Sequence, residues 1–210
     1  MALVVVPAKP LARAKARLAT VLTPDERRTL CLAMLADVCS AAVEADCGRV
    51  LVVASDTDAG AIARIFGAGV VRDPSPAAGL NASLEAAIPL EDDGVLIVAS
   101  DLPACTPDDV RAMTGFDGVL VATDASGTGT NALWRRPPDA IPLIFGEASA
   151  RHHRAAAEAG GIAVEVVHRP GLAFDVDLPS HLKDAWDASI GSNTRGALTD
   201  LGFPDRIASW

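Results

Sequence analysis

Two kinds of apolar stretch alternate along the 210-residue chain. One kind is short and rich in Val and Ile, which is typical of buried strands, and the other is longer, rich in Ala and Leu, and has helical spacing. Strands that alternate with helices predict a mainly parallel sheet covered on both faces, a three-layer α/β/α sandwich. The predicted strands are Ala2–Val6, Val50–Ala54, Gly69–Val71, Val95–Ala99, Val119–Ala122 and Ile162–Val167, with Asn131–Trp134 as an edge strand.

Two predicted helices begin with clear capping signals. Thr23-Pro24-Asp25-Glu26 combines a capping Thr, a Pro at the first helical position and a Glu three residues after the cap, and Thr106-Pro107-Asp108-Asp109 repeats this chemistry. The first of these helices is expected to reach about Val43, with Leu30, Met34, Leu35 and Val38 facing the interior. The other predicted helices are Ala59–Phe66, Ala82–Ile88, Ser149–Ala159 and one opened by Pro179.

The chain as a whole predicts one domain over residues 1–188 and a C-terminal tail, 189–210, with no clear pattern and no assigned role. Half of the residues are hydrophobic, only 4% are aromatic and Tyr is absent, so the core must be built from Ala, Val, Leu and Ile. The net charge of −9 makes general binding to nucleic acid or an anionic membrane unfavourable. The first apolar stretch precedes Lys9, the wrong order for a secretory signal, so we expect a cytoplasmic protein whose four Cys are reduced.

A cluster of basic residues follows the first predicted strand. Lys9, Arg13, Lys15 and Arg17 lie within nine residues that contain no acid. Such a cluster after a strand favours either a binding site for a nucleotide triphosphate or a solvated charged turn, and composition alone does not separate the two. No P-loop or GxGxxG motif is present, so any nucleotide is held differently from those families.

Three acidic residues stand where ligands bind in a parallel sheet, beyond the carboxyl ends of strands. Asp101 follows the strand Val95–Ala99, and Asp175 and Asp177 lie two apart on an extended segment, so their side chains point the same way. Paired carboxylates repel each other unless a cation or a proton lies between them, and Mg²⁺ prefers oxygen ligands of this kind. The alternatives are a cap or turn for Asp101 and an exposed turn for the pair.

Several other residues allow either a functional or a structural interpretation. Gly79 allows close approach of a ligand to the backbone, and Asn81 is either a reader of a base edge or the N-cap of the next helix. His152, His153 and His168 are interpreted as surface or polar-core side chains, and His181 is placed in the first turn of its helix. None of the four is assigned a catalytic role.

Taken together, these segments resemble the guanylyltransferases of coenzyme F420 biosynthesis, which act on 2-phospho-L-lactate or phosphoenolpyruvate. The resemblance spans about residues 3–188. It rests on Pro7–Leu18, Gly79-Leu80-Asn81, Gly129-Thr130-Asn131-Ala132-Leu133, Phe145-Gly146-x-x-Ser149-x-x-His152 and Phe174-Asp175-Val176-Asp177. Three positions depart from the family pattern without removing a charged group, namely Ala16, Ala78 and Leu178.

The resemblance implies a fold like that of the molybdopterin nucleotidyltransferases, GTP as the donor and Mg²⁺ as the cofactor. It implies that Asp101, Asp175 and Asp177 hold the metal. Residues expected to bind the nucleotide are Lys9, Arg13, Lys15, Arg17, Gly79 and Asn81, and those expected to bind the acid are Thr130, Gly146 and Ser149.

The expected reaction is attack of the acid's phosphate on the α-phosphorus of GTP with release of diphosphate, with Lys9, Lys15 and Asp101 as the catalytic residues. The acid is phosphoenolpyruvate, 2-phospho-L-lactate or 3-phospho-D-glycerate, and the sequence does not choose among them. A homodimer is left open, and the product is expected to pass to a downstream transferase. The alternatives are a metal-dependent glycosyltransferase that uses a nucleotide sugar and a non-enzymatic nucleotide sensor.

Overall fold

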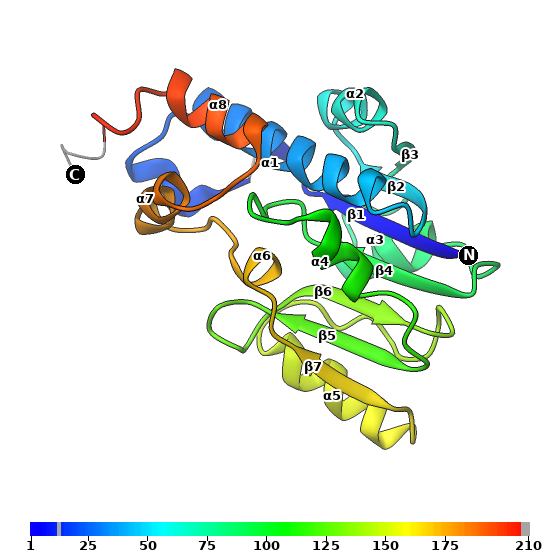
Figure 1. Cartoon of the computed structure of the whole chain (residues 1–210). Coiled ribbons are helices and arrows are strands. Elements are labelled where there is room, and N and C mark those ends of the chain that lie inside the picture. Colours follow the sequence, from blue (N-terminus) through cyan, green and yellow to red (C-terminus); the bar gives the residue numbers. More distant parts are fainter. Residues whose placement is uncertain (12–13, 207–210) are drawn as a thin grey trace.

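A computed structural model describes residues 1–11 and 14–206. Its sheet has seven strands in the order β3-β2-β1-β4-β6-β5-β7 (Figure 1). The strands are β1 (Ala2–Ala8), β2 (Gly48–Ala54), β3 (Gly69–Arg72), β4 (Gly94–Val98), β5 (Val119–Thr123), β6 (Thr130–Arg135) and β7 (Val164–Val167). The helices are η2 (Ala16–Thr20), α1 (Pro24–Glu44), α2 (Thr57–Ile65), α3 (Leu80–Ala87), α4 (Pro107–Ala112), α5 (Ser149–Ala159), α6 (Pro170–Ala173), α7 (Pro179–Asp187) and α8 (Ser192–Asp200).

The mainly parallel sheet is confirmed, and β6 is the strand that runs against its neighbours. It pairs antiparallel with both β4 and β5, whereas the other neighbouring strands pair in parallel. The expectation that Asn131–Trp134 lies at an edge is therefore wrong. Residues 132–135 are buried, which suits an interior strand, and the edges are the four-residue strands β3 and β7.

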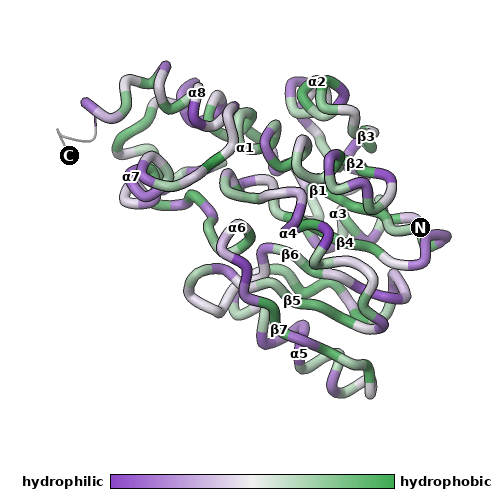
Figure 2. Tube along the Cα trace, in the orientation of Figure 1, coloured by the Kyte–Doolittle hydropathy of each residue, from purple (hydrophilic) through white to green (hydrophobic). Residues whose placement is uncertain are grey.

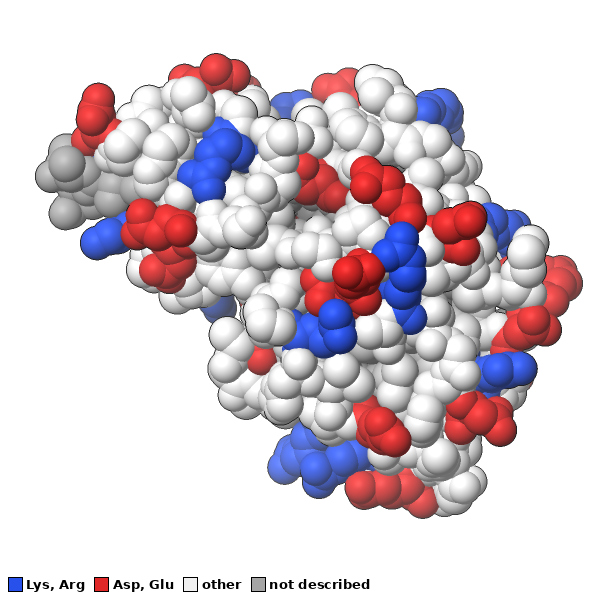
Figure 3. All heavy atoms as spheres, viewed as in Figure 1, with Lys and Arg blue, Asp and Glu red and all other residues white. Residues whose placement is uncertain are grey.

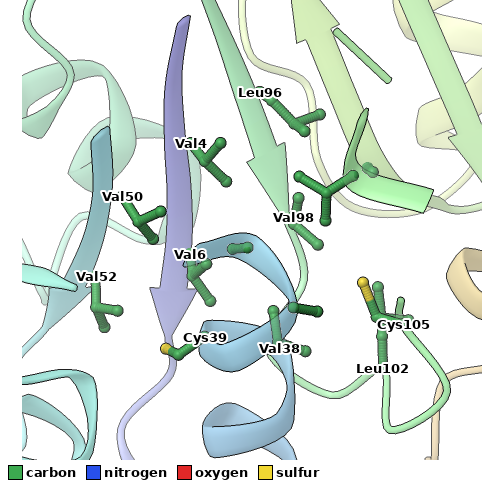
Figure 4. Close-up of a cluster of buried hydrophobic side chains, with 14 of the residues drawn as sticks. Val4, Val6, Val38, Cys39, Val50, Val52, Leu96, Val98, Leu102 and Cys105 are labelled. Atoms are coloured by element: carbon green, nitrogen blue, oxygen red, sulfur yellow. The ribbon is translucent and has the colours of Figure 1, made fainter. Parts of the chain in front are cut away.

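Alternating side chains of the strands build a core on each face of the sheet. Val4 and Val6 of β1 pack with Val38 of α1 and with apolar residues of α2, α4 and α6 (Figure 4). Leu3 and Val5 of the same strand pack on the opposite face, against α3 and α5. The three-layer arrangement is thus confirmed, and Figure 2 shows the strands as mostly hydrophobic segments within it.

The capping signals define the helix starts as expected. Thr23 and Glu26 form a reciprocal capping box at the start of α1, and Thr106 and Asp109 form one at the start of α4. All four residues expected on the inner face of α1 are at most 2% exposed: Leu30, Met34, Leu35 and Val38. The sequence did not reveal α6 or α8, because neither has a strong apolar period.

The segment after residue 188 packs on the rest of the molecule. Helix α8 lies alongside α1 (Figure 1), and its Leu198 joins Leu30 of α1 and Leu182 of α7 in a third apolar cluster. The buried carboxylate of Asp37 on α1 accepts hydrogen bonds from the backbone N–H of Asn193 and of Thr194, at 3.0 and 2.8 Å. These two bonds satisfy N–H groups in the first turn of α8, which fixes the helix on α1.

Charged side chains of both signs lie on the surface of the protein. On the face seen in Figure 3, Lys and Arg side chains lie in small groups beside Asp and Glu side chains. Among residues 1–11 and 14–206, none of the helices combines the length and the hydrophobicity needed to cross a lipid bilayer.

Candidate active site

The chain reverses its direction of winding between β1 and β4. From β1 it passes through α1 to β2 on one side, and it returns through α3 to β4 on the other side of β1. In open α/β sheets a crevice forms at such a point, beyond the carboxyl ends of the strands. Lys9 directly follows β1 and Asp101 lies three residues beyond β4, so both stand at this crevice.

An ion cluster of Lys15, Asp101 and Asp177 occupies the crevice. The Lys15 ammonium lies 2.5 Å from an Asp101 oxygen and 2.7 Å from an Asp177 oxygen, and only 6% of its side chain is exposed. Burial alone lowers the pKa of Lys15, but the two carboxylates outweigh it and the net pKa is raised. Lys15 is therefore a permanent cation and is unsuited to act as a general base.

The backbone at Lys15 is unusual for a residue with a side chain. Its φ of 53° and ψ of 43° lie in the left-handed region, at the N-cap of η2. Residues held in this region often mark functional sites, where the surrounding structure compensates for the strain. Here the two ion pairs of the ammonium give that compensation.

Asp175 and Asp177 point to the same side of their segment, as expected. Val176 between them is fully buried in the third apolar cluster, and both carboxylates line the same pocket as Asp101. Nδ1 of His181, in the first turn of α7 as expected, lies 3.2 Å from the Asp177 amide nitrogen and 3.0 Å from the Asp175 carbonyl oxygen. The apolar anchor and this imidazole fix the Asp-x-Asp segment.

The pKa values of the carboxylates differ. Burial acts to raise the pKa of Asp101, but Lys15 and Lys9 outweigh it, so the net pKa is lowered. The pKa of Asp175 is raised, first by burial and then by the charges of Asp101 and Asp177, although the Asn131 amide opposes this with a 3.3 Å hydrogen bond. Asp175 is thus a carboxylate whose charge has little compensation from the protein itself.

A divalent cation fits the chemistry of this donor set. Four carboxylates, Asp101, Asp124, Asp175 and Asp177, line one pocket of about 380 Å³ together with Lys9. An anionic ligand would enter such a pocket at high cost without added positive charge, and oxygen-rich sites suit Mg²⁺. However, no three acidic, His or Cys side chains of the described residues are already arranged around a metal position. Instead the Lys15 ammonium lies between Asp101 and Asp177.

A second pocket adjoins the first. It has a volume of about 240 Å³, is lined mainly by apolar side chains, and includes Gly79, Asp73 and Ser83. Pro7, Lys9 and Leu80 line both pockets, so Lys9 stands at their junction. At Gly79 the φ of 91° favours glycine, and a side chain there would meet open space.

The residues expected to bind the acid lie at the larger pocket or beneath it. Thr130, at the start of β6, and Gly146 line the pocket. Ser149 is the first residue of α5 and is 2% exposed, so it supports this wall from behind. Its amide donates to the Gly146 carbonyl at 3.3 Å.

Asn81 has a position that the sequence did not suggest. It is the second residue of α3, and Gly79 rather than Asn81 is the N-cap. Both ends of its side-chain amide hydrogen-bond to the backbone of Phe145. Oδ1 accepts from the Phe145 N–H at 2.9 Å, and Nδ2 donates to the Phe145 carbonyl at 3.1 Å. In this structure, Asn81 holds the segment that carries Gly146.

The remaining basic residues have different positions. Arg17 lies in η2 with an exposed side chain and lines neither pocket. Arg13 lies outside the described residues. The sequence also indicated no site role for Asp124, Asn131 or His153. Asn131 and His153 contact residues far away in the chain, whereas the Asp124 side chain bonds within its own loop, to Ser126 and Thr128. Asn131 lies in the segment Gly129–Leu133, which carries part of the family resemblance, but the resemblance assigned no role to Asn131.

Comparison with known proteins agrees with this geometry. Residues 2–207 match the family model described as "Guanylyl transferase CofC like". A phosphoenolpyruvate guanylyltransferase of Sphaerobacter thermophilus is 37% identical over 199 residues, which cover 90% of this chain and 95% of that protein.

Solved structures show the same fold at low identity. A putative nucleotide-diphospho-sugar transferase of Desulfovibrio desulfuricans has a TM-score of 0.72 at 15% identity and covers 99% of this chain and 97% of its own. A nucleotidyl transferase from Methanothermobacter has a TM-score of 0.64 at 20% identity, with coverage of 89% and 96%.

The family match favours nucleotidyl transfer over the glycosyltransferase and sensor alternatives. It extends over almost the whole chain, and the relative is well above the identity at which only the fold is shared. The chain belongs to the CofC-like guanylyl transferase family and is a nucleotidyltransferase.

Proposed function

We propose that this enzyme transfers GMP from GTP to phosphoenolpyruvate, with release of diphosphate, as a step in coenzyme F420 biosynthesis. The acceptor is suggested by the name of the Sphaerobacter relative, which acts on phosphoenolpyruvate. The single observation that carries the proposal is the junction of the two pockets, where Lys9 lies beside the cluster of Lys15, Asp101 and Asp177.

The smaller pocket is the proposed site of the nucleoside. Its lining is mainly apolar, which suits the faces of a base, and its polar groups include the Asp73 carboxylate. A carboxylate matches the donor groups on the edge of guanine. The triphosphate would then extend past Gly79 toward Lys9 and Lys15, whose charges balance it.

The larger pocket is the proposed site of the acid. Thr130 offers a hydroxyl, and Gly146 exposes backbone without a side chain. Helix α5 begins just behind Gly146, and the positive end of a helix favours a carboxylate or a phosphate nearby.

The residues that would hold Mg²⁺ are Asp101, Asp175 and Asp177. When bound, the ion would neutralise charge on the phosphate oxygens and on the departing diphosphate. The protein's own part is to hold the two substrates in line, to keep Asp101 ionised, and to supply Lys9 and Lys15 as fixed positive charge. No general base is needed, because a phosphate with a second pKa near 6 is already ionised at neutral pH.

The test is a substrate panel with the purified chain, GTP and Mg²⁺. Phosphoenolpyruvate, 2-phospho-L-lactate and 3-phospho-D-glycerate are supplied one at a time, and diphosphate release and product mass are measured. We expect the highest kcat/KM with phosphoenolpyruvate, and no release without an acid or after chelation of the metal. A higher kcat/KM with either other acid overturns the acceptor, and no product with any of the three overturns the function. Replacing GTP with ATP or CTP tests the nucleotide.

A further inference from the structure

His153 on α5 lies inside the protein, behind the wall of the larger pocket. It is fully buried, and its ring packs edge-on against Phe145, with 5.1 Å between the ring centroids. Burial, with smaller contributions from Arg135 and His152, lowers the pKa of His153 to about 4. The ring is therefore neutral near pH 7 and carries one N–H.

The backbone determines which ring nitrogen carries that hydrogen. The Ile144 N–H donates to Nε2 of His153, with 3.0 Å between the nitrogens. Because a backbone N–H can only donate, Nε2 must be the acceptor and is not protonated. The single hydrogen of the neutral ring is then on Nδ1.

This tautomer imposes a direction on the next hydrogen bond. Nδ1 lies 3.1 Å from Oγ1 of Thr130, and a protonated Nδ1 must donate to it. Among the described residues, this is the only hydrogen bond of the Thr130 side chain. Its own hydroxyl hydrogen therefore remains for another partner, and Thr130 lines the larger pocket.

We infer that His153 is a positioning residue, which makes the Thr130 hydroxyl a hydrogen-bond donor to an anionic oxygen of the acid substrate. The inference rests on the proposed function, since it assumes that the larger pocket binds the acid. The same ring also connects two walls of that pocket, because Thr130 begins β6 and Ile144 directly precedes Phe145 and Gly146.

Two substitutions separate the two hydrogen bonds of the ring. In His153→Asn the amide nitrogen takes about the place of Nδ1 and can still donate to Thr130. In His153→Gln the amide reaches the place of Nε2 and can accept from Ile144, but the donor to Thr130 is lost. His152→Gln, at the neighbouring and partly exposed position, is the control.

We expect His153→Gln to raise KM for phosphoenolpyruvate about fivefold to tenfold, the effect of about one hydrogen bond, without changing KM for GTP. His153→Asn should stay within about twofold of the wild type. Equal KM values for both variants, or an unchanged KM in His153→Gln, would overturn the inference.

A double-mutant cycle with Thr130→Val gives a second readout. If His153 acts through the Thr130 hydroxyl, His153→Gln adds no further rise in KM to that of Thr130→Val. Additive effects would overturn the inference, because they would show that the ring supports the pocket without acting on the hydroxyl.

Nitrogen-15 NMR of the imidazole in the wild-type protein tests the tautomer without any activity. A protonated Nδ1 and an unprotonated Nε2 support the inference, and a protonated Nε2 overturns it. This measurement tests the inference even if the variants do not fold, because it uses the wild-type protein. It also separates the two proposals, since a protein with the expected tautomer that makes no product with any acid would contradict only the proposed function.

Discussion

The two sides of the crevice differ in the chemical groups that they offer to a ligand. On the side of β1 and β4, the groups are charged: Lys9, Lys15 and Asp101, joined by Asp175 and Asp177 from the segment before α7. On the side of β6 and α5, the groups proposed to contact the acid are neutral: Thr130 and Gly146 face the pocket, and Asn81 and His153 support them from behind. Asp124, directly after β5, is the carboxylate beside them. The charged side is suited to balance phosphates. The neutral side is suited to recognise the shape and hydrogen-bonding groups of a small acid.

The largest effect is expected from the charged side. Asp175→Asn should lower kcat by at least about 100-fold, because it removes one of the proposed metal ligands at the point where charge develops. The fold should survive, since Val176 rather than Asp175 anchors this segment in the interior.

Asp184→Asn, at an exposed position on α7, is the matched control for that substitution. Steady-state turnover and circular dichroism are measured for both variants. A turnover rate near that of the wild type in Asp175→Asn would show that this residue is not a metal ligand. Loss of the helical circular dichroism signal would show that the substitution acts on folding instead.

The second effect tests the neutral side through pH. The pKa of His153 is about 4 in the folded protein and about 6.5 when unfolded, so the unfolded chain binds more protons between these values. The stability that comes from a neutral His153 is complete above about pH 6.5 and falls as the pH drops toward 4.

Between pH 7 and 5 this loss amounts to about 2 kcal/mol. Urea unfolding at pH 5 and 7 measures it, with His153→Gln as the reference because Gln does not titrate. The free energy of unfolding should fall more steeply in the wild type than in the variant. Parallel changes in the two proteins would show that His153 is not buried as a neutral ring.

The same contrast explains how far the sequence predicts the structure. The capping boxes at Thr23 and Thr106 and the buried face of α1 are local signals, so they locate helices without any knowledge of the fold. The sign of a charge and its place after a strand are also visible in the sequence. For this reason Lys9 and Asp101 were expected at the crevice.

The neutral side depends on contacts between distant residues. Asn81 and Phe145 are 64 positions apart and Thr130 and His153 are 23 apart, so no local pattern reveals these pairs. Likewise β6 has a short apolar run that fits an edge as well as an interior position. Only its pairing with β4 and β5 shows that it lies inside the sheet. The resemblance to a family indicated Thr130 and Gly146, but it did not show what orients them.

A smaller effect is expected at the junction of the two pockets. Lys9→Ala should raise KM for GTP about tenfold, the loss of one charge-assisted contact to the triphosphate, with little change in KM for the acid. Lys183→Ala, at an exposed position on α7, is the control. A loss confined to the acid would contradict the assignment of Lys9 to the nucleotide.

The smallest effect separates two roles of Asn81. The resemblance assigns it to the nucleotide, whereas in the structure both ends of its amide bind the backbone of Phe145, next to Gly146. If that contact is its main role, Asn81→Ala loosens the wall of the larger pocket at Gly146. KM for phosphoenolpyruvate should then rise about fivefold, as expected for the loss of about one net hydrogen bond. KM for GTP should stay unchanged, and both constants come from the same steady-state assay. A rise in KM for GTP instead would assign Asn81 to the base, and the neutral side of the crevice would then serve both substrates.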